Sequence, residues 1–192
     1  MLSKEEVLNI FTEAKALLTG HFRLTSGRHS NRYMQCAQVL KFPEYAQKLC
    51  ADLAAKFQGQ KIDIVVGPAM GGIIVSYEVA RALGVPSIFC EREQGQMKLR
   101  RGFTIEPGAN VLVVEDVVTT GGSVKEVMNV IRELGGNIVG VGVLVDRSNG
   151  AVDFGVPLHA ELTMDIQSWE ADDCPLCKEG IPVVKPGSRE VK

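Results

Sequence analysis

The sequence lacks an apolar run long enough to cross a bilayer. Hydrophobic residues make up 45% of the 192 residues, but charges interrupt them well before the roughly 18 consecutive apolar residues that a membrane helix needs. Residues 1–6 are charged and lack the apolar core of a secretory signal peptide. We therefore expect a cytoplasmic protein without a membrane partner.

A strong charge bias is also missing. The chain has 21 basic and 23 acidic residues, and its net charge is −2. Such a balance gives no general attraction to nucleic acid, so we expect no nucleic-acid partner, and any anion must be bound by locally placed groups. The sequence has no G-x-x-x-x-G-K-[ST] segment, which excludes a P-loop nucleotide site.

Cysteine is scarce, with five residues spread along the chain. This number does not suit a secreted scaffold held by disulfides. Three cysteines lie in apolar segments and are expected to be buried: Cys36, Cys50 and Cys90. Cys174 and Cys177 have the C-x-x-C spacing of half a zinc site, but no second pair is present, so His159 or another subunit would have to contribute. A reduced turn is the favoured interpretation.

The most informative stretch runs from residue 111 to residue 134. An apolar segment of strand length ends in two adjacent carboxylates, Glu115 and Asp116. A loop of hydroxyl residues and glycine follows, and residues 124–134 then show helical periodicity. Because the free backbone amides at a helix start attract anions, this order predicts a site for a nucleotide or a sugar phosphate.

The loop residues and the acidic pair suit different parts of such a ligand. Glycines allow the backbone to approach a phosphate closely, and the hydroxyl groups are uncharged donors. The carboxylates would repel a phosphate, so we expect them to accept hydrogen bonds from sugar hydroxyl groups or to hold a divalent cation. The alternative is an ordinary strand-to-helix turn with one capping hydroxyl, which does not explain two carboxylates ahead of three hydroxyl groups.

This stretch resembles the phosphoribosyl pyrophosphate motif of type I phosphoribosyltransferases. The resemblance implies that Glu115 and Asp116 contact the ribose 2- and 3-hydroxyl groups and contribute to catalysis. It implies Mg²⁺ as the cofactor, held mainly by the substrate, with Asp116 as the protein carboxylate near it. It assigns the 5-phosphate to Val117, Val118, Thr119, Thr120, Gly121, Gly122 and Ser123.

A second glycine-rich loop joins a predicted strand to the predicted helix at residues 72–83. A second such helix start indicates a second anion site, and a tight turn that needs glycine for close packing is the alternative. In the resembled family this loop binds pyrophosphate through backbone amides, which gives that role to Met70, Gly71 and Gly72. The loop has no charged side chain, so the charge must be neutralised by a metal or by another segment.

Residues 20–35 are polar and are predicted to form two short extended pieces around a Ser-Gly turn, which either cap the fold or line a site. The segment is similar to the N-terminal hood of orotate phosphoribosyltransferases at Phe22, Leu24, Ser26, Gly27, Ser30 and Tyr33. Many of those enzymes have a substrate-contacting lysine where this chain has Thr25. Arg23, Arg28 and Arg32 are the candidates for the missing positive charge.

Residues 92–108 are charged and contain glycine, and we expect a long basic flap over the pyrophosphate, with a solvated hairpin as the alternative. In the orotate family a mobile loop reaches the neighbouring subunit's site, which implies a homodimer. Arg92 matches the first residue of that loop's Arg-Lys pair and is expected to bind phosphoribosyl pyrophosphate, whereas Glu93 replaces the lysine. The candidates for the loop's catalytic positions are Lys98 and Arg100, with Arg101 next.

Arg147 follows a predicted strand at residues 137–145. Ligands of an open parallel sheet bind beyond the carboxyl ends of the strands, where an arginine fork suits a carboxylate. A surface arginine is the alternative. The resembled family recognises orotate through an arginine at this place and the first loop threonine, which are Arg147 and Thr119 here.

Predicted strands alternate with predicted helices along the chain. The strands lie near residues 62–66, 87–91, 111–115 and 137–145, and the helices near residues 43–57, 72–83 and 123–134. The pattern predicts an α/β fold, a doubly wound and mainly parallel sheet flanked by helices, with both glycine loops on one edge. We expect one domain over residues 1–192, with a small hood formed by about residues 1–40 and the C-terminal segment.

The two ends of the chain are less regular. A capping box at Ser3 and Glu6 begins an amphipathic helix that is expected to run to Gly20 and to bury Leu17. The tail around Trp169 is expected to lie over the body as a short strand and loop.

The resemblance implies the transfer of a 5-phosphoribosyl group from phosphoribosyl pyrophosphate to orotate, giving orotidine 5-phosphate and pyrophosphate, in pyrimidine (UMP) synthesis. One alternative is a purine or uracil phosphoribosyltransferase, which would share both glycine loops without needing the hood or Arg147. The other is a regulator that senses phosphoribosyl pyrophosphate and binds nucleic acid without catalysis. A regulator needs a basic face or an added DNA-binding module, and neither the net charge nor the length favours it.

Overall fold

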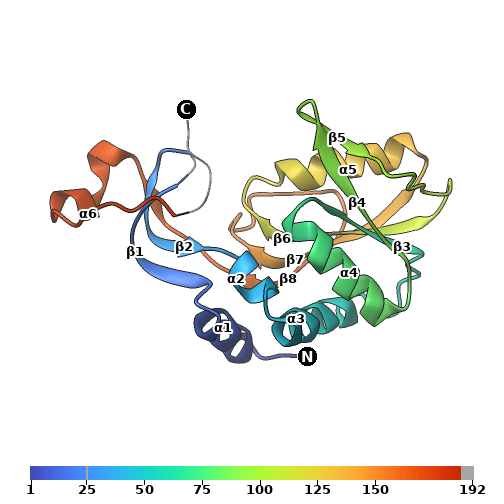
Figure 1. Ribbon diagram of the computed structural model, residues 1–192, viewed down its shortest axis with the longest axis horizontal. Helices are drawn as coiled ribbons and strands as arrows, with labels where there is room; N and C mark the ends of the chain where they lie inside the picture. The colour runs from blue at the N-terminus through green and yellow to red at the C-terminus, as the bar shows by residue number, and fades with distance from the viewer. Residues whose placement is uncertain (25, 187–192) are drawn as a thin grey trace.

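The computed structural model describes residues 1–24 and 26–186, so Thr25 lies outside the described residues. A six-stranded sheet has the order β5-β4-β3-β6-β7-β8, and a three-stranded sheet has the order β1-β2-β9. Figure 1 shows the two sheets side by side, with the smaller sheet and α6 at one end of the molecule and α5 and β5 toward the other.

The larger sheet confirms the predicted fold class. Its strands are β3 (Ile64–Pro68), β4 (Ser87–Glu93), β5 (Gln96–Leu99), β6 (Asn110–Val118), β7 (Asn137–Asp146) and β8 (Leu158–Thr163). Neighbouring strands pair in parallel, except that β4 and β5 form an antiparallel hairpin. The parallel edge strand β8 is an addition to the prediction, which placed only a short strand and loop in the tail.

Helices cover both faces of this sheet. The longer ones are α1 (Lys4–Glu13), α3 (Pro43–Ala55), α4 (Gly71–Leu83) and α5 (Gly122–Glu133), and α2 (Ala37–Leu40) is short. Leu112 and Val114 of β6 join the core beneath α3 and α4, whereas Val111 and Val113 join the core beneath α5. Successive side chains of a strand point to opposite faces, so this alternation buries both faces of the sheet. No helix in the described parts of the chain is long and apolar enough to span a bilayer.

The N-terminal helix begins as predicted and ends earlier. The capping box of Ser3 and Glu6 is present, but α1 ends at Glu13, because Lys15 adopts a left-handed φ of 53°. Leu17 then belongs to β1 (Leu17–Arg23) and pairs with Met34 of β2. Leu17 fitted the helical spacing of apolar residues because it also packs against the core, but it does so from a strand.

Residues from both ends of the chain build the smaller sheet, which we call the hood. β1 and β2 (His29–Met34) form an antiparallel hairpin, and the two-residue strand β9 (Ser168–Trp169) adds to β2. After β9 the chain forms η1 (Ala171–Asp173) and α6 (Pro175–Lys178) and returns to β1, where Val184 bridges Phe22. The hood therefore depends on segments about as far apart in sequence as the chain allows.

Candidate active site

Both glycine loops lie at one edge of the larger sheet. β3 and β6 are neighbouring parallel strands, and each leads from its carboxyl end through a loop into a helix, α4 and α5 respectively. This is the edge at which ligands of open parallel sheets bind. The prediction that the two loops share an edge is confirmed.

The acidic pair lies within β6, which continues to Val118, and not beyond its end. Glu115 is buried and Asp116 half-buried, and the Asp116 backbone amide donates a hydrogen bond of 3.0 Å to Oε1 of Glu115. Burial raises the pKa of Glu115 well above its ordinary value, and the neighbouring charge of Asp116 raises it further. Burial also raises the pKa of Asp116. A cation or ligand hydroxyl groups would favour the ionised forms of this pair.

The loop after β3 contacts the acidic pair directly. A Cβ atom added to Gly71 would collide with the carboxylate of Asp116, so only glycine fits there without a shift. A Cβ atom on Gly72 would lie 2.8 Å from Cδ of Pro68 and 3.2 Å from Oε1 of Glu115. The two motifs predicted to bind pyrophosphate and ribose therefore meet at one point.

The loop after β6 encloses a pocket of about 370 Å³. Every residue from Val117 to Ser123 lines it, together with Glu115 and Arg92. Gly121 has a left-handed φ of 74° and precedes the first residue of α5, where a helix leaves its amide groups free. A Cβ atom on Gly121 would also lie 2.8 Å from the side chain of Val152. The residues predicted to bind the 5-phosphate are therefore gathered around one cavity at a helix start.

Arg92 reaches this pocket and is held there by Glu126. Its Nη2 atom donates a hydrogen bond of 2.9 Å to Oε1 of Glu126, and its Nη1 atom lies 2.8 Å from Oε2. Glu126 lines the same pocket and was missed from the sequence. The available signal was its spacing, because it lies one turn after Gly122 and hence on the same side of α5 as the helix start.

The basic segment is more regular than predicted. Residues up to Leu99 complete the β4–β5 hairpin, in which backbone pairs such as Glu91 with Lys98 extend the sheet, so this part has the hairpin form that was the alternative to a long flap. Lys98 lies 2.9 Å from Glu93, and Arg100 lies 3.0 Å from the same carboxylate. Neither residue is among those that line the pocket. Their catalytic role stays a prediction.

Arg147 follows β7 at the same edge, and its backbone amide donates a 2.8 Å hydrogen bond to the carbonyl oxygen of Val118. Its Nε atom is buried and has no hydrogen-bond partner in the described structure. Burial lowers the pKa of its guanidinium group. Near it, Sγ of Cys36 lies 3.6 Å from the backbone oxygen of Asp116. Arg147 thus offers an unused hydrogen-bond donor at this sheet edge, while Thr119 lies exposed on the loop.

Comparison with known proteins identifies the family. A family model described as a phosphoribosyl transferase domain matches residues 38–154. An orotate phosphoribosyltransferase of Pelotomaculum thermopropionicum is 64% identical over 99% of this chain and 100% of its own length. The chain belongs to the orotate phosphoribosyltransferase family. A second family member, from Desulforamulus reducens, is 61% identical with the same coverage of both chains.

Solved phosphoribosyltransferase structures share the fold. The crystal structure of orotate phosphoribosyltransferase from Aeropyrum pernix matches with a TM-score of 0.68 and 28% identity, and the alignment covers 82% of this chain and 93% of the other. The part that matches the family model contains both glycine loops, the acidic pair and Arg147. Most of the hood lies outside that part, in residues before 38 and after 154.

Proposed function

We propose that this protein transfers the 5-phosphoribosyl group of phosphoribosyl pyrophosphate to orotate in the cytoplasm, giving orotidine 5-phosphate and pyrophosphate for pyrimidine synthesis. The observation that carries the proposal is the match, along nearly the whole chain, to proteins named orotate phosphoribosyltransferases. The geometry supports it, because the predicted phosphate loop, the acidic pair and an arginine with an unpaired buried Nε atom lie at one sheet edge.

The reaction requires no protein nucleophile. The bond between C1 of the ribose and the pyrophosphate oxygen breaks, and the bonding electrons leave with the pyrophosphate. A ring nitrogen of orotate bonds to C1 and loses its proton, for which the departing pyrophosphate is an acceptor. Positive charge develops on the ribose as the bond breaks, so catalysis depends on orientation and on charge stabilisation. The loop from Val117 to Ser123 fixes the 5-phosphate, Met70 to Gly72 bind the pyrophosphate through backbone amides, and Glu115 and Asp116 accept hydrogen bonds from the ribose hydroxyl groups.

The donor set at this edge suits Mg²⁺. Oxygen atoms, which Mg²⁺ prefers as ligands, come from Glu115, Asp116 and the loop hydroxyl groups. Asp116 is the residue that would lie nearest the ion, with most other ligands coming from the substrate. When bound, the ion neutralises part of the negative charge of the pyrophosphate.

The orotate carboxylate pairs with Arg147. The guanidinium group is half-buried and lacks a carboxylate partner in the part of the chain that the structure describes, so binding a substrate carboxylate would satisfy a desolvated donor. Thr119 lies exposed at the start of the adjacent loop and offers a hydroxyl group to the same base. A hypoxanthine or adenine base has no carboxylate for this arginine.

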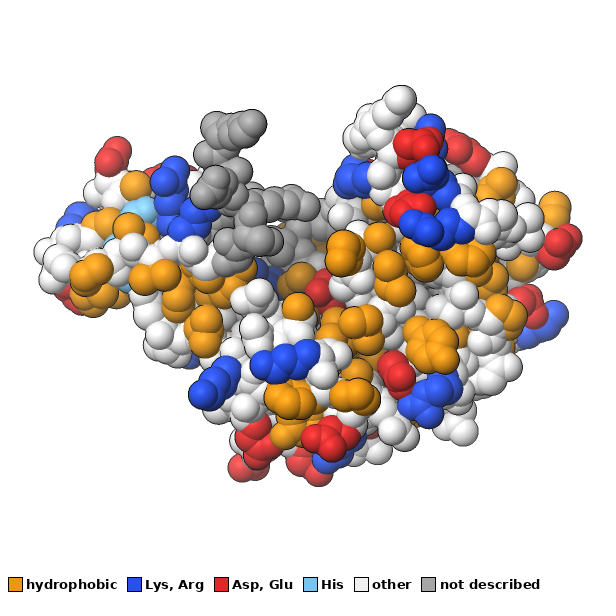
Figure 2. All heavy atoms as spheres, viewed as in Figure 1, with side chains coloured by type: hydrophobic (Ala, Val, Ile, Leu, Met, Phe, Trp, Pro, Cys, Tyr) orange, Lys and Arg blue, Asp and Glu red, His pale blue; other side chains and the backbone are white. Residues whose placement is uncertain are grey.

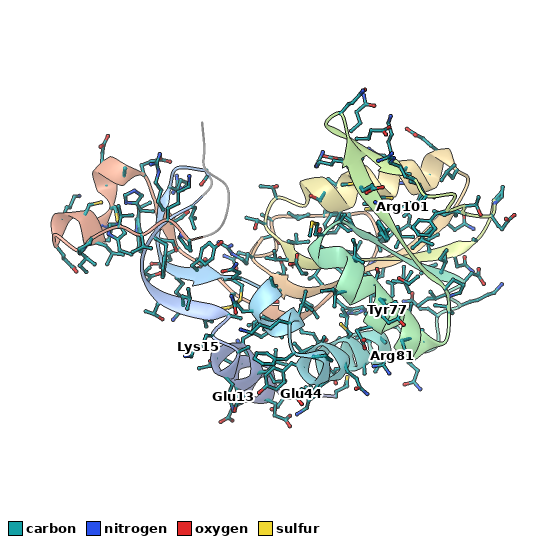
Figure 3. All side chains as sticks on the ribbon, in the orientation of Figure 1. Glu13, Lys15, Glu44, Tyr77, Arg81 and Arg101 are labelled. Carbon is teal, nitrogen blue, oxygen red and sulfur yellow. The ribbon has the colours of Figure 1, made fainter. Side chains whose placement is uncertain are left out.

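The active form is a homodimer in which the β4–β5 hairpin serves the partner's site. Lys98 and Arg100 do not line the pocket of their own chain, which fits a role in the partner's pocket. Met70, Ile74 and Tyr77 are 82%, 42% and 63% exposed and lie at helical spacing along α4. Figure 2 shows hydrophobic side chains gathered over this helix, and Figure 3 shows Tyr77 on α4 below Arg101 of the hairpin segment. This apolar surface is the proposed contact between the subunits.

Parallel assays of pyrophosphate release with orotate, uracil, hypoxanthine and adenine test the substrate. We expect release with orotate alone, and an Arg147→Met variant should lose about 10- to 100-fold in kcat/KM for orotate, since a charged hydrogen bond is removed. Arg132→Met is the control, because Arg132 is an exposed residue of α5. Faster release with another base would identify a different phosphoribosyltransferase. Binding of phosphoribosyl pyrophosphate without release with any base would identify a regulator.

A further inference from the structure

Two histidines and two cysteines meet in the hood. His21 lies on β1, His29 on β2, Cys174 directly before α6, and Cys177 within α6. One ligand atom from each residue lies within 4.8 Å of all the others. His21, His29 and Cys174 are buried, and Cys177 is exposed. We call these four residues the hood cluster.

The hood cluster supplies the second ligand pair that the C-x-x-C pair lacked in the sequence. The pair was expected to form a reduced turn because no second ligand pair was visible, but the β1–β2 hairpin brings His21 and His29 to it. His159, the histidine considered first, lies on β8 with its ring centroid 4.9 Å from that of Phe57 and is not part of the cluster. The eight-residue separation of His21 and His29 is longer than the histidine spacing of zinc fingers, so the pairing was hidden in the sequence.

The separations suit one tetrahedral ion. The Cys177 sulfur lies 3.2 Å from Nδ1 of His29 and 3.7 Å from Nε2 of His21, and the Cys174 sulfur lies 3.5 Å from the same Nε2. Tetrahedral zinc, with its ordinary bond lengths, places sulfur and nitrogen ligands roughly 3.6 Å apart. The two ring nitrogens are 2.9 Å apart, so the rings would separate by a few tenths of an ångström on binding.

The histidine orientation also suits a metal. Nδ1 of His21 lies 2.7 Å from the carbonyl oxygen of Ile181, and a carbonyl only accepts, so Nδ1 carries the hydrogen. The neutral ring then has its lone pair on Nε2, which faces His29 and both sulfur atoms. A backbone carbonyl that fixes the tautomer in this way is a regular partner of a metal-binding histidine.

The C-terminal segment of the hood has little apolar core of its own. Neither η1 nor α6 contributes a buried residue, and Cys174, between them, is fully buried. The other contacts of this segment with β1 and β2 are polar or backbone contacts: the pairing of β9 with β2, the bridge between Val184 and Phe22, and the hydrogen bonds of Arg28 with Ser168 and Glu170. A segment with so small an apolar core usually needs a disulfide or a metal.

We propose that His21, His29, Cys174 and Cys177 bind a structural zinc ion that fastens the C-terminal segment to the hood. Two thiolates and two imidazoles fill a tetrahedral site and favour zinc over magnesium or calcium, which prefer oxygen ligands. Four protein ligands leave no open position for a substrate, so the ion stabilises the hood and takes no part in the transfer reaction.

Metal analysis of the untagged full chain, purified without chelators, tests the site. We expect about one zinc per chain. Cobalt(II) supplied in place of zinc should give the visible absorption of a tetrahedral site and a charge-transfer band from the two thiolates. Cys174→Ser, Cys177→Ser and His21→Asn should each lose most of the zinc, whereas His159→Asn and Cys90→Ala should retain it, because they remove the same groups outside the hood cluster.

Unfolding measurements connect the ion to the hood. A strong chelator should lower the melting temperature of the wild-type protein and leave that of Cys177→Ser unchanged. A wild-type protein with no metal and two freely reactive thiols at Cys174 and Cys177 would overturn the proposal, as would a disulfide between them, which mass analysis detects. The wild-type zinc content and cobalt spectrum decide the question even if the variants fail to fold, and neither depends on which base the enzyme accepts.

Discussion

Asp116 lies at the contact between the two glycine loops. Its carboxylate packs against Gly71, its neighbour Glu115 is buried, and burial raises its own pKa. A carboxylate in such surroundings is costly to ionise without a ligand, so its position is explained by what it does for the substrate.

Asp116→Asn keeps the shape of this side chain and removes its charge. We expect kcat to fall by about 100-fold, because a preorganised charge near the developing ribosyl cation is lost. The melting temperature should change little, since the substituted group no longer needs to ionise in a buried place. Initial rates at saturating substrates, compared with thermal unfolding, measure both effects. An unchanged kcat would remove Asp116 from the catalytic residues.

Glu115 predicts how stability depends on pH. Its folded-state pKa is raised, mainly by burial, above the value of about 4.3 expected in the unfolded chain. Between the unfolded-state pKa and the folded-state pKa, Glu115 binds more protons in the folded protein than in the unfolded chain. Its contribution to the free energy of unfolding is therefore fully present below the unfolded-state pKa and is lost as the pH rises through the folded-state pKa. The free energy of unfolding of the substrate-free protein should therefore decrease with rising pH.

Glu115→Gln cannot ionise and should flatten this dependence. Urea unfolding at about pH 6 and about pH 8.5 measures the slope. Glu133→Gln is the matched control, because Glu133 is an exposed residue at the end of α5. If Glu115→Gln retains the wild-type slope, Glu115 is not the group that titrates.

At the scale of the structural elements, the connection from β3 to α4 leaves little space for a side chain at Gly71. Gly71→Ala would place a methyl group where the Asp116 carboxylate lies. We expect a loss of about 1–3 kcal/mol in the free energy of unfolding, as for other overpacked sites, and about a 10-fold increase in KM for phosphoribosyl pyrophosphate. Gly122→Ala controls for stability, since a Cβ atom there has only Oγ1 of Thr120 nearby, at 3.8 Å. Equal stability of the two variants would contradict the clash.

The buried parallel strands were predictable because each of them contains an uninterrupted apolar run. β3, β4, β6 and β7 lie within a few residues of their predicted positions, since strands covered on both faces read as continuous apolar runs. β8 was missed because His159 and Glu161 interrupt its apolar pattern. Glu161 is buried only because Nζ of Lys56, on a distant helix end, lies 2.7 Å away. Local periodicity carries no information about such a partner.

In the site, too, features that are local in sequence were predictable and contacts between distant residues were not. The acidic pair and the phosphate loop are contiguous in sequence, so their chemistry was visible in one stretch. The pairing of Arg92 with Glu126 joins a strand to a helix 34 residues later, and His21 meets Cys174 across 153 residues. Contacts of this kind depend on how the chain folds in space. The sequence pattern predicts the fold class, but it does not predict which distant residues meet.

At the scale of the whole molecule, the proposed dimer predicts complementation. A mixture of Lys98→Ala and Asp116→Asn chains, unfolded and refolded together, should form mixed dimers in which one of the two sites has both residues intact. Random pairing would restore about one quarter of the wild-type activity. The control mixture is Asp116→Asn with Glu115→Gln, because these residues are neighbours in β6 and serve the same chain's site. Activity no higher than that of the separate variants would argue against a shared site.

The hood also has a consequence for biosynthesis. Its hairpin, β1 and β2, leaves the ribosome well before β9 and Val184, which complete the same sheet. At a synthesis rate of about 5–20 residues per second, the edge of β2 stays unpaired for on the order of 10 s. During that time chaperones and other nascent chains can bind to it. A product truncated before residue 168 never acquires the strand that covers β2.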